Sequence, residues 1–179
     1  MYQNLCHTNR IIMEGYYMIR FAKEEDVPAI QLIAKLSLED AYINLLSSDV
    51  RDQFIEKFYS RKLIDELIEH QNVMMADTEA GTVGFAIYQK EDDLLRIYAL
   101  YILPDHQRKG TGTELLDALV NYAKPENDGI GIELESRNIP AQKFYQQAGF
   151  IAEKTYPYDL FGQPLKMNFV VKRFTKENQ

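Results

Sequence analysis

An alternation of strand, helix and strand in the second half of the chain constrains its fold more than any other feature. Leu94–Leu103 is apolar apart from Arg96, so as a strand it must be covered on both faces. The polar, glycine-containing segment Gln107–Gly112 then leads into Glu114–Ala123, whose apolar residues recur at helical spacing. Ile130–Leu134 is a second apolar strand. This order predicts a helical crossover between two strands of one sheet.

The preceding part of the chain indicates more helices and an antiparallel meander. Met18–Phe21 alternates as a strand does, and apolar residues recur at helical spacing through much of Asp26–Gln71. Val73–Asp77 and Thr82–Lys90 are strand-like runs that flank a short loop with a glycine. We therefore expect these two runs to form a meander with the apolar strand that follows them.

The end of the chain is predicted as a helix followed by a hairpin. Ile139–Gln147 has helical spacing, and Gly149 stands in the usual helix-terminating position. Ile151–Tyr158 and Leu165–Phe174 are the two strands of the hairpin. Because no internal repeat or low-complexity tract interrupts the pattern, we predict a single α/β (α+β) domain at residues 18–174.

The two ends of the chain differ from this domain. Residues 1–17 lack the alternation that begins at Met18, and they lack the basic start and long apolar core of a secretion signal. We expect them to be a loosely ordered extension, with Met18 as a candidate for the functional start. Residues 175–179 are expected to be a C-terminal tail.

Composition excludes several classes of function. A net charge of −7 and a pI near 5.0 argue against binding to a nucleic-acid backbone, which requires a basic face. No apolar run approaches the roughly 20 residues that span a bilayer, so no membrane partner is expected. The single cysteine, Cys6, excludes an internal disulfide and suits the cytoplasm. His7, His70 and His106 lack metal-ligand spacing, so no metal site is predicted.

Gln107–Gly112 has the chemistry of an anion-binding loop. The first N–H groups of a helix have no intrahelical partner, the helix dipole adds partial positive charge, and glycines let the backbone curl around a phosphate. The loop is not a P-loop, and Leu115 stands where a dinucleotide-binding loop has its third glycine. What remains is Q-x-x-G-x-G with two cations, Arg108 and Lys109. The alternative is an ordinary solvated turn.

A second motif lies downstream, with the pattern N-x-x-A-x-x-F-Y-x-x-x-G-F from Asn138 to Phe150. Together the two motifs resemble the GNAT superfamily of acyl-CoA-dependent N-acyltransferases. The resemblance is specific from about Leu94 to Phe150 and compatible from Met18 to Phe174, and it is absent from the first 17 residues. It implies a mixed, mostly antiparallel sheet of about six to seven strands flanked by helices, which splays between the two central strands to admit acyl-CoA.

The resemblance also implies where acetyl-CoA, the cosubstrate, binds. The pyrophosphate would lie on the loop formed by Arg108, Lys109, Gly110, Thr111, Gly112 and Thr113. The pantetheine amides would pair with backbone groups of Tyr101, Ile102 and Leu103, and Asn138 would begin a helix and contact the cofactor arm. These assignments agree with the chemistry, because phosphates bind N–H groups and cations, and a pantetheine arm binds unpaired strand amides.

Tyr145 and Glu133 are the candidate catalytic residues. Tyr145 matches the family tyrosine that faces the thioester sulfur, and a phenol can protonate a departing thiolate. Glu133 stands where some similar ribosomal-protein acetyltransferases carry a base that deprotonates the amine. Glu135 lies on the same face of that strand and could serve instead, as could a chain of waters. The alternatives are a tyrosine in the pocket wall and solvated acids at a strand end.

The sequence therefore predicts an N-acetyltransferase that moves an acetyl group from acetyl-CoA to a primary amine by direct attack in a ternary complex. The alternative is an acyl-CoA-binding sensor without turnover. The acceptor is open between a polyamine, an aminoglycoside-like amine and a peptide or protein amine, and its pocket is expected between Asp26–Gln71 and Tyr156–Pro164, where Asp159 could meet an amine. Whether the chain forms a homodimer also stays open.

Overall fold

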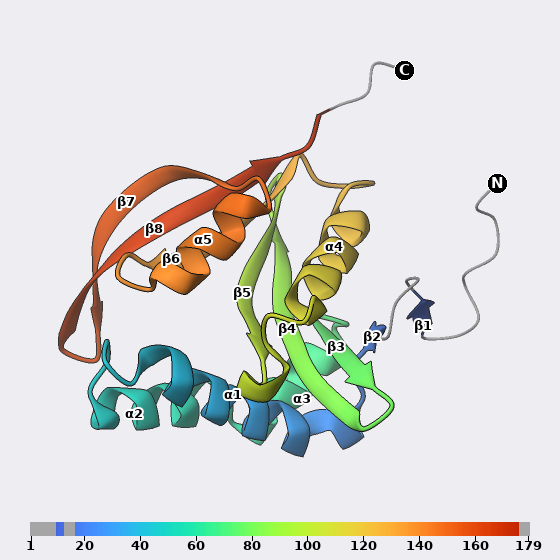
Figure 1. The fold of residues 1–179 in the computed structure, drawn as a ribbon, viewed down its shortest axis with the longest axis horizontal. Helices are drawn as coiled ribbons and strands as arrows, with labels where there is room; N and C mark the ends of the chain where they lie inside the picture. The colour runs from blue at the N-terminus through green and yellow to red at the C-terminus, as the bar shows by residue number, and fades with distance from the viewer. Residues whose placement is uncertain (1–9, 13–16, 176–179) are drawn as a thin grey trace.

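The computed structural model describes residues 10–12 and 17–175, and in them eight strands form one open sheet with helices on both faces (Figure 1). The strands are β1 (Arg10–Ile12), β2 (Met18–Phe21), β3 (Val73–Thr78), β4 (Gly81–Glu91), β5 (Leu94–Ile102), β6 (Gly129–Glu135), β7 (Ile151–Leu160) and β8 (Gln163–Arg173). The α-helices are α1 (Val27–Tyr42), α2 (Ser48–Phe58), α3 (Arg61–Glu69), α4 (Thr111–Ala123) and α5 (Ile139–Gln147). Short 3-10 helices, η1 (Glu24–Asp26) and η2 (Pro104–His106), precede α1 and the loop before α4.

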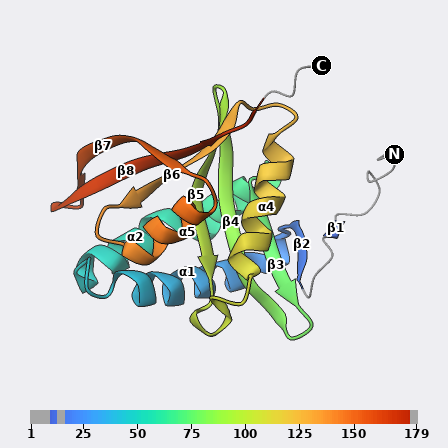
Figure 2. The same cartoon turned by 45° about the horizontal axis from the view of Figure 1, so that its top comes forward.

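The strand order is β1-β2-β3-β4-β5-β6-β8-β7, and only β5 and β6 pair in parallel. This confirms the predicted mixed, mostly antiparallel sheet, with β2–β8 as the expected strands and the short β1 added at one edge. The helix α4 makes the crossover between β5 and β6, as the sequence pattern predicts. Figures 1 and 2 show that β6–β8 fan away from β2–β5, with α5 beside the opening.

Local sequence explains where the helices begin and end. Ser47, Ser60 and Asn138 are the N-caps of α2, α3 and α5, and each side-chain oxygen accepts a hydrogen bond from a backbone N–H of the first turn. Pro28 lies in the first turn of α1, where a missing N–H costs nothing. Gly149 follows α5 with φ of 86°, a left-handed conformation that ends the helix.

Two hydrophobic clusters cover opposite faces of the sheet. On one face α4 and α5 pack against the strands through Leu115, Leu119 and Tyr145. On the other face α1 and α3 pack against β3–β5 through Ile30, Ile33 and Ile64. Side chains alternate between the two faces along β6. Ile130, Ile132 and Leu134 lie on the first face, so Glu133 and Glu135 lie on the second.

The β7–β8 hairpin packs on the start of α2. Leu160 and Leu165 of the hairpin cluster with Leu46 and Val50, and Gln163 donates a hydrogen bond to the carbonyl oxygen of Leu45 at 2.8 Å. The structure thus brings together the two segments between which the sequence analysis expects the acceptor pocket.

The expectation of a loosely ordered extension falls mostly outside the described residues. Of the first 17 residues the structure describes Arg10–Ile12, which pairs with β2, and Tyr17. Cys6 and His7 lie outside the described part. Among the described residues no helix is long and apolar enough to cross a membrane.

Candidate active site

The two central strands separate after a short parallel ladder. Leu94–Ile97 pairs with Gly129–Ile132, and beyond these positions β5 and β6 are not paired with each other. A register shift in the β4–β5 ladder accompanies the separation, because Ile97 and Ala99 have partners in β4 but Tyr98 between them has none. Such a bulge bends a strand away from its neighbour. The result is an opening bounded by Tyr98–Ile102 on one side and Glu133–Glu135 on the other.

One edge of this opening presents backbone groups of β5. The N–H of Leu103 donates to the carbonyl oxygen of Val83 at 2.9 Å, so it is not free for a ligand. Because hydrogen bonds to a neighbouring strand alternate along an antiparallel ladder, the N–H of Tyr101 also points to β4 and that of Ile102 points to the opening. The carbonyl oxygen of Ile102 already accepts from Ser37 and Gln107. Of the three predicted pantetheine contacts, Ile102 is the one with its N–H at the open edge.

The predicted anion loop lies beside this edge, at the N-terminus of α4. Gly110 is the N-cap with φ of 94°, a left-handed backbone that glycine makes accessible, and Arg108 two residues earlier also has a positive φ, of 57°. Thr111 is buried and donates to the carbonyl oxygen of His106 at 3.3 Å, which holds the loop to η2. Arg108 and Lys109 are exposed. The loop therefore offers free helical N–H groups and two cations, as a pyrophosphate requires.

Two further residues of the loop face α5 and the solvent. Gly112 faces Phe144, since a Cβ atom there would lie 3.6 Å from its ring. Thr113 is exposed on the first turn of α4. Tyr17 donates a hydrogen bond to the carbonyl oxygen of Lys109 at 3.1 Å, so the segment before β2 also contacts the loop.

Tyr145 lies on α5 with its ring deep in the protein. The side chain is 4% exposed and packs edge-on against Phe144 and Phe150, with ring centroids 5.0 and 5.1 Å away. Burial raises the pKa of the phenol well above its ordinary value, and the nearby Tyr42 raises it further. Within the described residues the hydroxyl makes no hydrogen bond, so the proton is held on an oxygen that is free for a ligand.

Four tyrosines approach one another here and form what we name the tyrosine cluster: Tyr42, Tyr59, Tyr101 and Tyr145. Burial is the main cause that raises the pKa of each. The neighbouring tyrosines raise the pKa of Tyr101 and Tyr145 further, whereas the hydrogen bond with Tyr101 lowers that of Tyr59. The sequence analysis missed Tyr42 and Tyr59. No spacing could have found them, because they lie at the ends of α1 and α2 in a chain with 12 tyrosines.

Glu133 lies at the start of the opening, on the face that is opposite α4. Its side chain is 41% exposed, and its Oε1 accepts from the Arg96 guanidinium at 2.8 Å and from the hydroxyl of Tyr156. Burial and this hydrogen bond to Glu133 raise the pKa of Tyr156, so the phenol stays the donor. Within the described residues Oε2 has no hydrogen-bond partner. Glu133 is thus accessible and keeps one free oxygen.

Arg96, the counter-ion of Glu133, is fixed by packing. Its guanidinium lies over the ring of Phe169, with 4.2 Å from Cζ to the ring centroid, and it also pairs with Glu91 at 3.6 Å. Phe169 occupies the place that a side chain at position 131 would need, since a Cβ atom on Gly131 would lie 2.7 Å from the ring. The glycine in β6 therefore leaves room for the Phe169 ring, over which the Arg96 guanidinium lies.

Glu135 has a different environment on the same strand face. Its side chain is 2% exposed, and both oxygens are occupied, one by the Nε of Arg137 at 2.8 Å and one by the backbone N–H of Arg137 at 2.6 Å. The carboxylate thus holds the turn between β6 and α5. Asn138 in that turn is buried, and its Oδ1 accepts from the N–H of Ala141 at 3.2 Å, so it begins α5 as the resemblance implies.

The remaining candidates have structural partners. Asp159 accepts from the backbone N–H of Gly162 and shapes the β7–β8 turn. His70 contacts the carbonyl oxygen of Glu66, and His106 is half-buried in η2. Across residues 10–12 and 17–175 no group of three or more histidine, cysteine or acidic side chains is arranged to hold a metal ion.

A family model described as an acetyltransferase (GNAT) domain matches residues 32–158. The chain belongs to the GNAT family of acetyltransferases. The matched residues include β5, the loop before α4, β6 and α5.

Curated relatives of the GNAT family are distant. The chain is 26% identical over 162 residues to the L-amino acid N-acyltransferase MnaT of Escherichia coli, which covers 85% of this chain and 91% of that protein. It is 28% identical over 123 residues to an uncharacterized N-acetyltransferase of Bacillus pumilus. That alignment covers 69% of this chain and 66% of the relative, slightly under two thirds of its length.

Solved GNAT structures share the fold. The PaiA N-acetyltransferase of Thermoplasma acidophilum, in complex with coenzyme A, has a TM-score of 0.79 at 20% identity and covers 89% of this chain and 100% of that one. A putative acetyltransferase of Salmonella typhimurium, solved with its cofactor acetyl-CoA, has a TM-score of 0.63 at 22% identity and covers 92% and 98%. Both of these structures hold coenzyme A or acetyl-CoA on the fold that this chain shares.

Proposed function

We propose that this GNAT protein transfers the acetyl group of acetyl-CoA to a primary amine by direct attack in a ternary complex. The observation that carries the proposal is the opening between β5 and β6, which has the anion loop at one end and Tyr145 and Glu133 along its sides. A cofactor held at its distant phosphates and along its arm places the thioester next to the amine, which supplies the positional part of catalysis.

The donor would extend β5 as an added strand. Its pyrophosphate would bind the N–H groups of Gly110–Thr113 with Arg108 and Lys109, and its pantetheine amides would bind the gap-facing backbone of β5 at Ile102. The N–H groups at this edge also suit the thioester carbonyl, where negative charge develops during attack.

Tyr145 would act as the general acid. Its raised pKa keeps the phenol protonated at neutral pH, and its hydroxyl has no partner within the described residues. When the tetrahedral intermediate collapses, the C–S bond breaks and the sulfur takes the electron pair as a thiolate. A proton from the phenol then yields the free thiol of coenzyme A.

Glu133 would be the base that takes a proton from the acceptor ammonium, directly or through a water, so that the neutral amine attacks the thioester carbonyl. It is the accessible carboxylate of the pair on β6 and keeps Oε2 free, whereas both oxygens of the buried Glu135 are bound by Arg137. These contacts favour Glu133 as the base and a structural role for Glu135.

The acceptor is an amine that reaches Glu133 from the face covered by α1 and α2. Aromatic and acidic side chains on this face favour a cationic amine, which agrees with polyamines, aminoglycoside-like amines and peptide amines. The name of the MnaT relative adds free L-amino acids to the acceptors to be tested. A cytoplasmic location is part of the same proposal.

The test is the release of coenzyme A from acetyl-CoA by purified protein, measured with polyamines, amino acids, aminoglycosides and peptides. We expect at least one class to stimulate release, with acetylated amine formed in equal amount. Binding of acetyl-CoA without stimulation by any amine would instead support the acyl-CoA sensor and would overturn the proposed transfer.

A further inference from the structure

Three exposed apolar side chains line up on the outer side of α1, and we name them the α1 stripe: Leu32, Leu36 and Ile43. Their exposed fractions are 56%, 43% and 58%, and Ile43 is the C-cap residue, which continues the helical backbone. At 3.6 residues per turn they lie within about 40° of one another around the helix. Ile30 and Ala34, which pack toward the sheet, lie on the opposite side. In Figures 1 and 2 α1 runs along one border of the molecule, so the stripe points outward.

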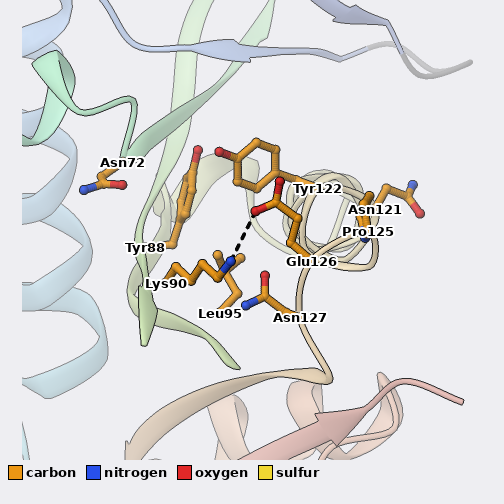
Figure 3. A pocket seen from close by; sticks show the side chains of 9 residues that line it. All are labelled: Asn72, Tyr88, Lys90, Leu95, Asn121, Tyr122, Pro125, Glu126 and Asn127. Atoms are coloured by element: carbon orange, nitrogen blue, oxygen red, sulfur yellow. Dashed lines mark hydrogen bonds and ion pairs between the residues drawn. The ribbon is translucent and has the colours of Figure 1, made fainter. Parts of the chain in front are cut away.

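The other exposed apolar side chains are scattered. In the described part of the chain the remaining large ones are spread over β5, α4, α5 and β7: Tyr98, Tyr122, Ile139, Ile151 and Tyr158. Tyr122, for example, meets the ring of Tyr88 edge-on at 5.4 Å in the wall of a small cavity (Figure 3). Single exposed apolar residues are normal on a protein surface, whereas a contiguous group is typical of an interaction site. The α1 stripe is such a group.

Two opposite charges follow one side of the stripe. Lys35 is exposed and has no ion-pair partner within the described residues. Glu39, one turn further along α1, is 40% exposed, and its Oε1 accepts from the Nε of Arg51 at 3.0 Å. Its other carboxylate oxygen has no partner in residues 10–12 and 17–175. This side of the stripe thus offers one cation and one carboxylate oxygen to a partner.

This pattern is complementary to itself when a second α1 runs antiparallel to the first. With a two-fold axis between positions 37 and 38, Leu32 lies opposite Ile43 of the second copy, and the two Leu36 side chains are about 4.5 Å apart along the helix axis. The same symmetry keeps corresponding sides of the two stripes together, so Lys35 lies opposite Glu39 of the second copy, and the pairing occurs twice. A second copy therefore matches both the apolar stripe and its charges.

We propose that α1 is the interface of a homodimer in which two copies of this chain pack α1 against α1, antiparallel, around a two-fold axis near Leu36. Contacts of this self-complementary kind are the commonest among soluble oligomers. A single pair of helices makes a small interface, so we expect a weak dimer, with a Kd of about 10–100 μM. The dimer requires neither acetyl-CoA nor an amine, so it goes beyond the proposed transfer and does not depend on it.

The experiment is sedimentation of the full chain from about 5 to about 500 μM. Leu36→Lys places two like charges beside the two-fold axis and should raise the Kd of the dimer about tenfold or more. Ile151→Lys is the matched control, because Ile151 is 73% exposed but lies on β7. It should leave the Kd unchanged. A wild-type chain that stays monomeric at about 500 μM would overturn the proposal, and so would a dimer that only Ile151→Lys disrupts.

A charge exchange tests the register of the two helices. Lys35→Glu and Glu39→Lys each place like charges opposite one another, so each variant alone should dimerise about threefold to tenfold more weakly. An equimolar mixture of the two should regain the wild-type Kd, because both pairs then join opposite charges. Leu36→Lys keeps the test valid if Glu39→Lys unfolds for lack of its bond to Arg51. No gain on mixing two folded variants would contradict the antiparallel register.

The dimer and the proposed acetyl transfer can fail separately. Leu36 belongs to neither the opening nor the anion loop, so Leu36→Lys should bind coenzyme A as the wild type does. Isothermal titration of the variant with coenzyme A measures this affinity and also confirms that the monomer is folded. A variant that has lost coenzyme A binding together with the dimer would show that α1 acts on folding and would overturn its assignment as a separate interface.

Discussion

The two sides of the opening differ in how the chain builds them. Most of the donor side comes from one stretch, with β5, the anion loop and the start of α4 following one another from Leu94 to about Leu116, and the start of α5 at Asn138 completes it. The acceptor side comes from distant segments, since Tyr42 and Tyr59 belong to the first helices and Glu133, Tyr156 and Phe169 belong to the last strands. A continuous stretch keeps its geometry through local structure, whereas the acceptor side exists only once the whole domain is folded.

We infer from this difference that cofactor recognition and acceptor recognition can be changed independently. Substitutions on the donor side should affect the KM for acetyl-CoA, while those on the acceptor side should affect kcat, the acceptor KM or folding. The substitutions below test whether the two sides act separately.

Tyr145→Phe should have the largest effect, because it removes the proton that the leaving thiolate needs. We expect kcat to fall roughly 10²-fold to 10³-fold, in the range of general acid catalysis, with little change in the binding of coenzyme A. Since burial raises the pKa of this phenol, the wild-type rate should show no loss of the acid as pH rises from about 7 to about 9. Steady-state kinetics at several pH values together with a coenzyme A titration measure both effects. Unchanged kcat in the variant would remove Tyr145 from the mechanism.

Glu133→Gln should lower kcat/KM for the acceptor by about 10-fold to 100-fold, because the amide cannot take the ammonium proton. Glu153→Gln is the matched control, since Glu153 is also a half-exposed carboxylate paired to an arginine and lies away from the opening. The measurement is acceptor kinetics at fixed, saturating acetyl-CoA. If Glu133→Gln behaves like its control, a water chain or another group must serve as the base.

Glu135→Gln should act on folding rather than on chemistry. The substitution weakens charge-assisted hydrogen bonds to Arg137 from a side chain that is 2% exposed, so we expect a loss of about 1–3 kcal/mol in the free energy of unfolding. Urea denaturation of the variant and the wild type measures this loss. A stable variant with a large loss of kcat would reverse the assignment of the two glutamates.

Arg108→Ala combined with Lys109→Ala should raise the KM for acetyl-CoA about tenfold and leave kcat nearly unchanged, since both cations are exposed and in the proposed complex contact only the donor. The effect should shrink in high salt because exposed charges are screened. Lys124→Ala, which removes an exposed lysine at the far end of α4, serves as the control. An equal change in acceptor KM would show that the two sides of the opening are not separate.

The sequence predicts the donor side better than the acceptor side for the same reason. The apolar strand β5, the loop with Gly110 and the helix α5 that begins at Asn138 depend on local spacing and caps, and the structure has all of them. The tyrosine cluster and the contact between Arg96 and Phe169 depend on tertiary packing, which no local spacing records. Strand alternation places Glu133 and Glu135 on one face, but it could not indicate that one is accessible and the other is enclosed by Arg137.

The short ladder between β5 and β6 has a mechanical consequence. Only Leu94–Ile97 and Gly129–Ile132 join the two parts of the sheet through paired strands, so this seam is narrow compared with the long hairpins on either side. A donor that bonds along the open edge of β5 would lengthen the seam and stiffen the domain while it binds. We therefore expect hydrogen exchange at the backbone amides of Leu100 and Ile102 to slow when acetyl-CoA is added. The bound substrate would then stabilise the junction between the two parts of the sheet, and its release would loosen it again.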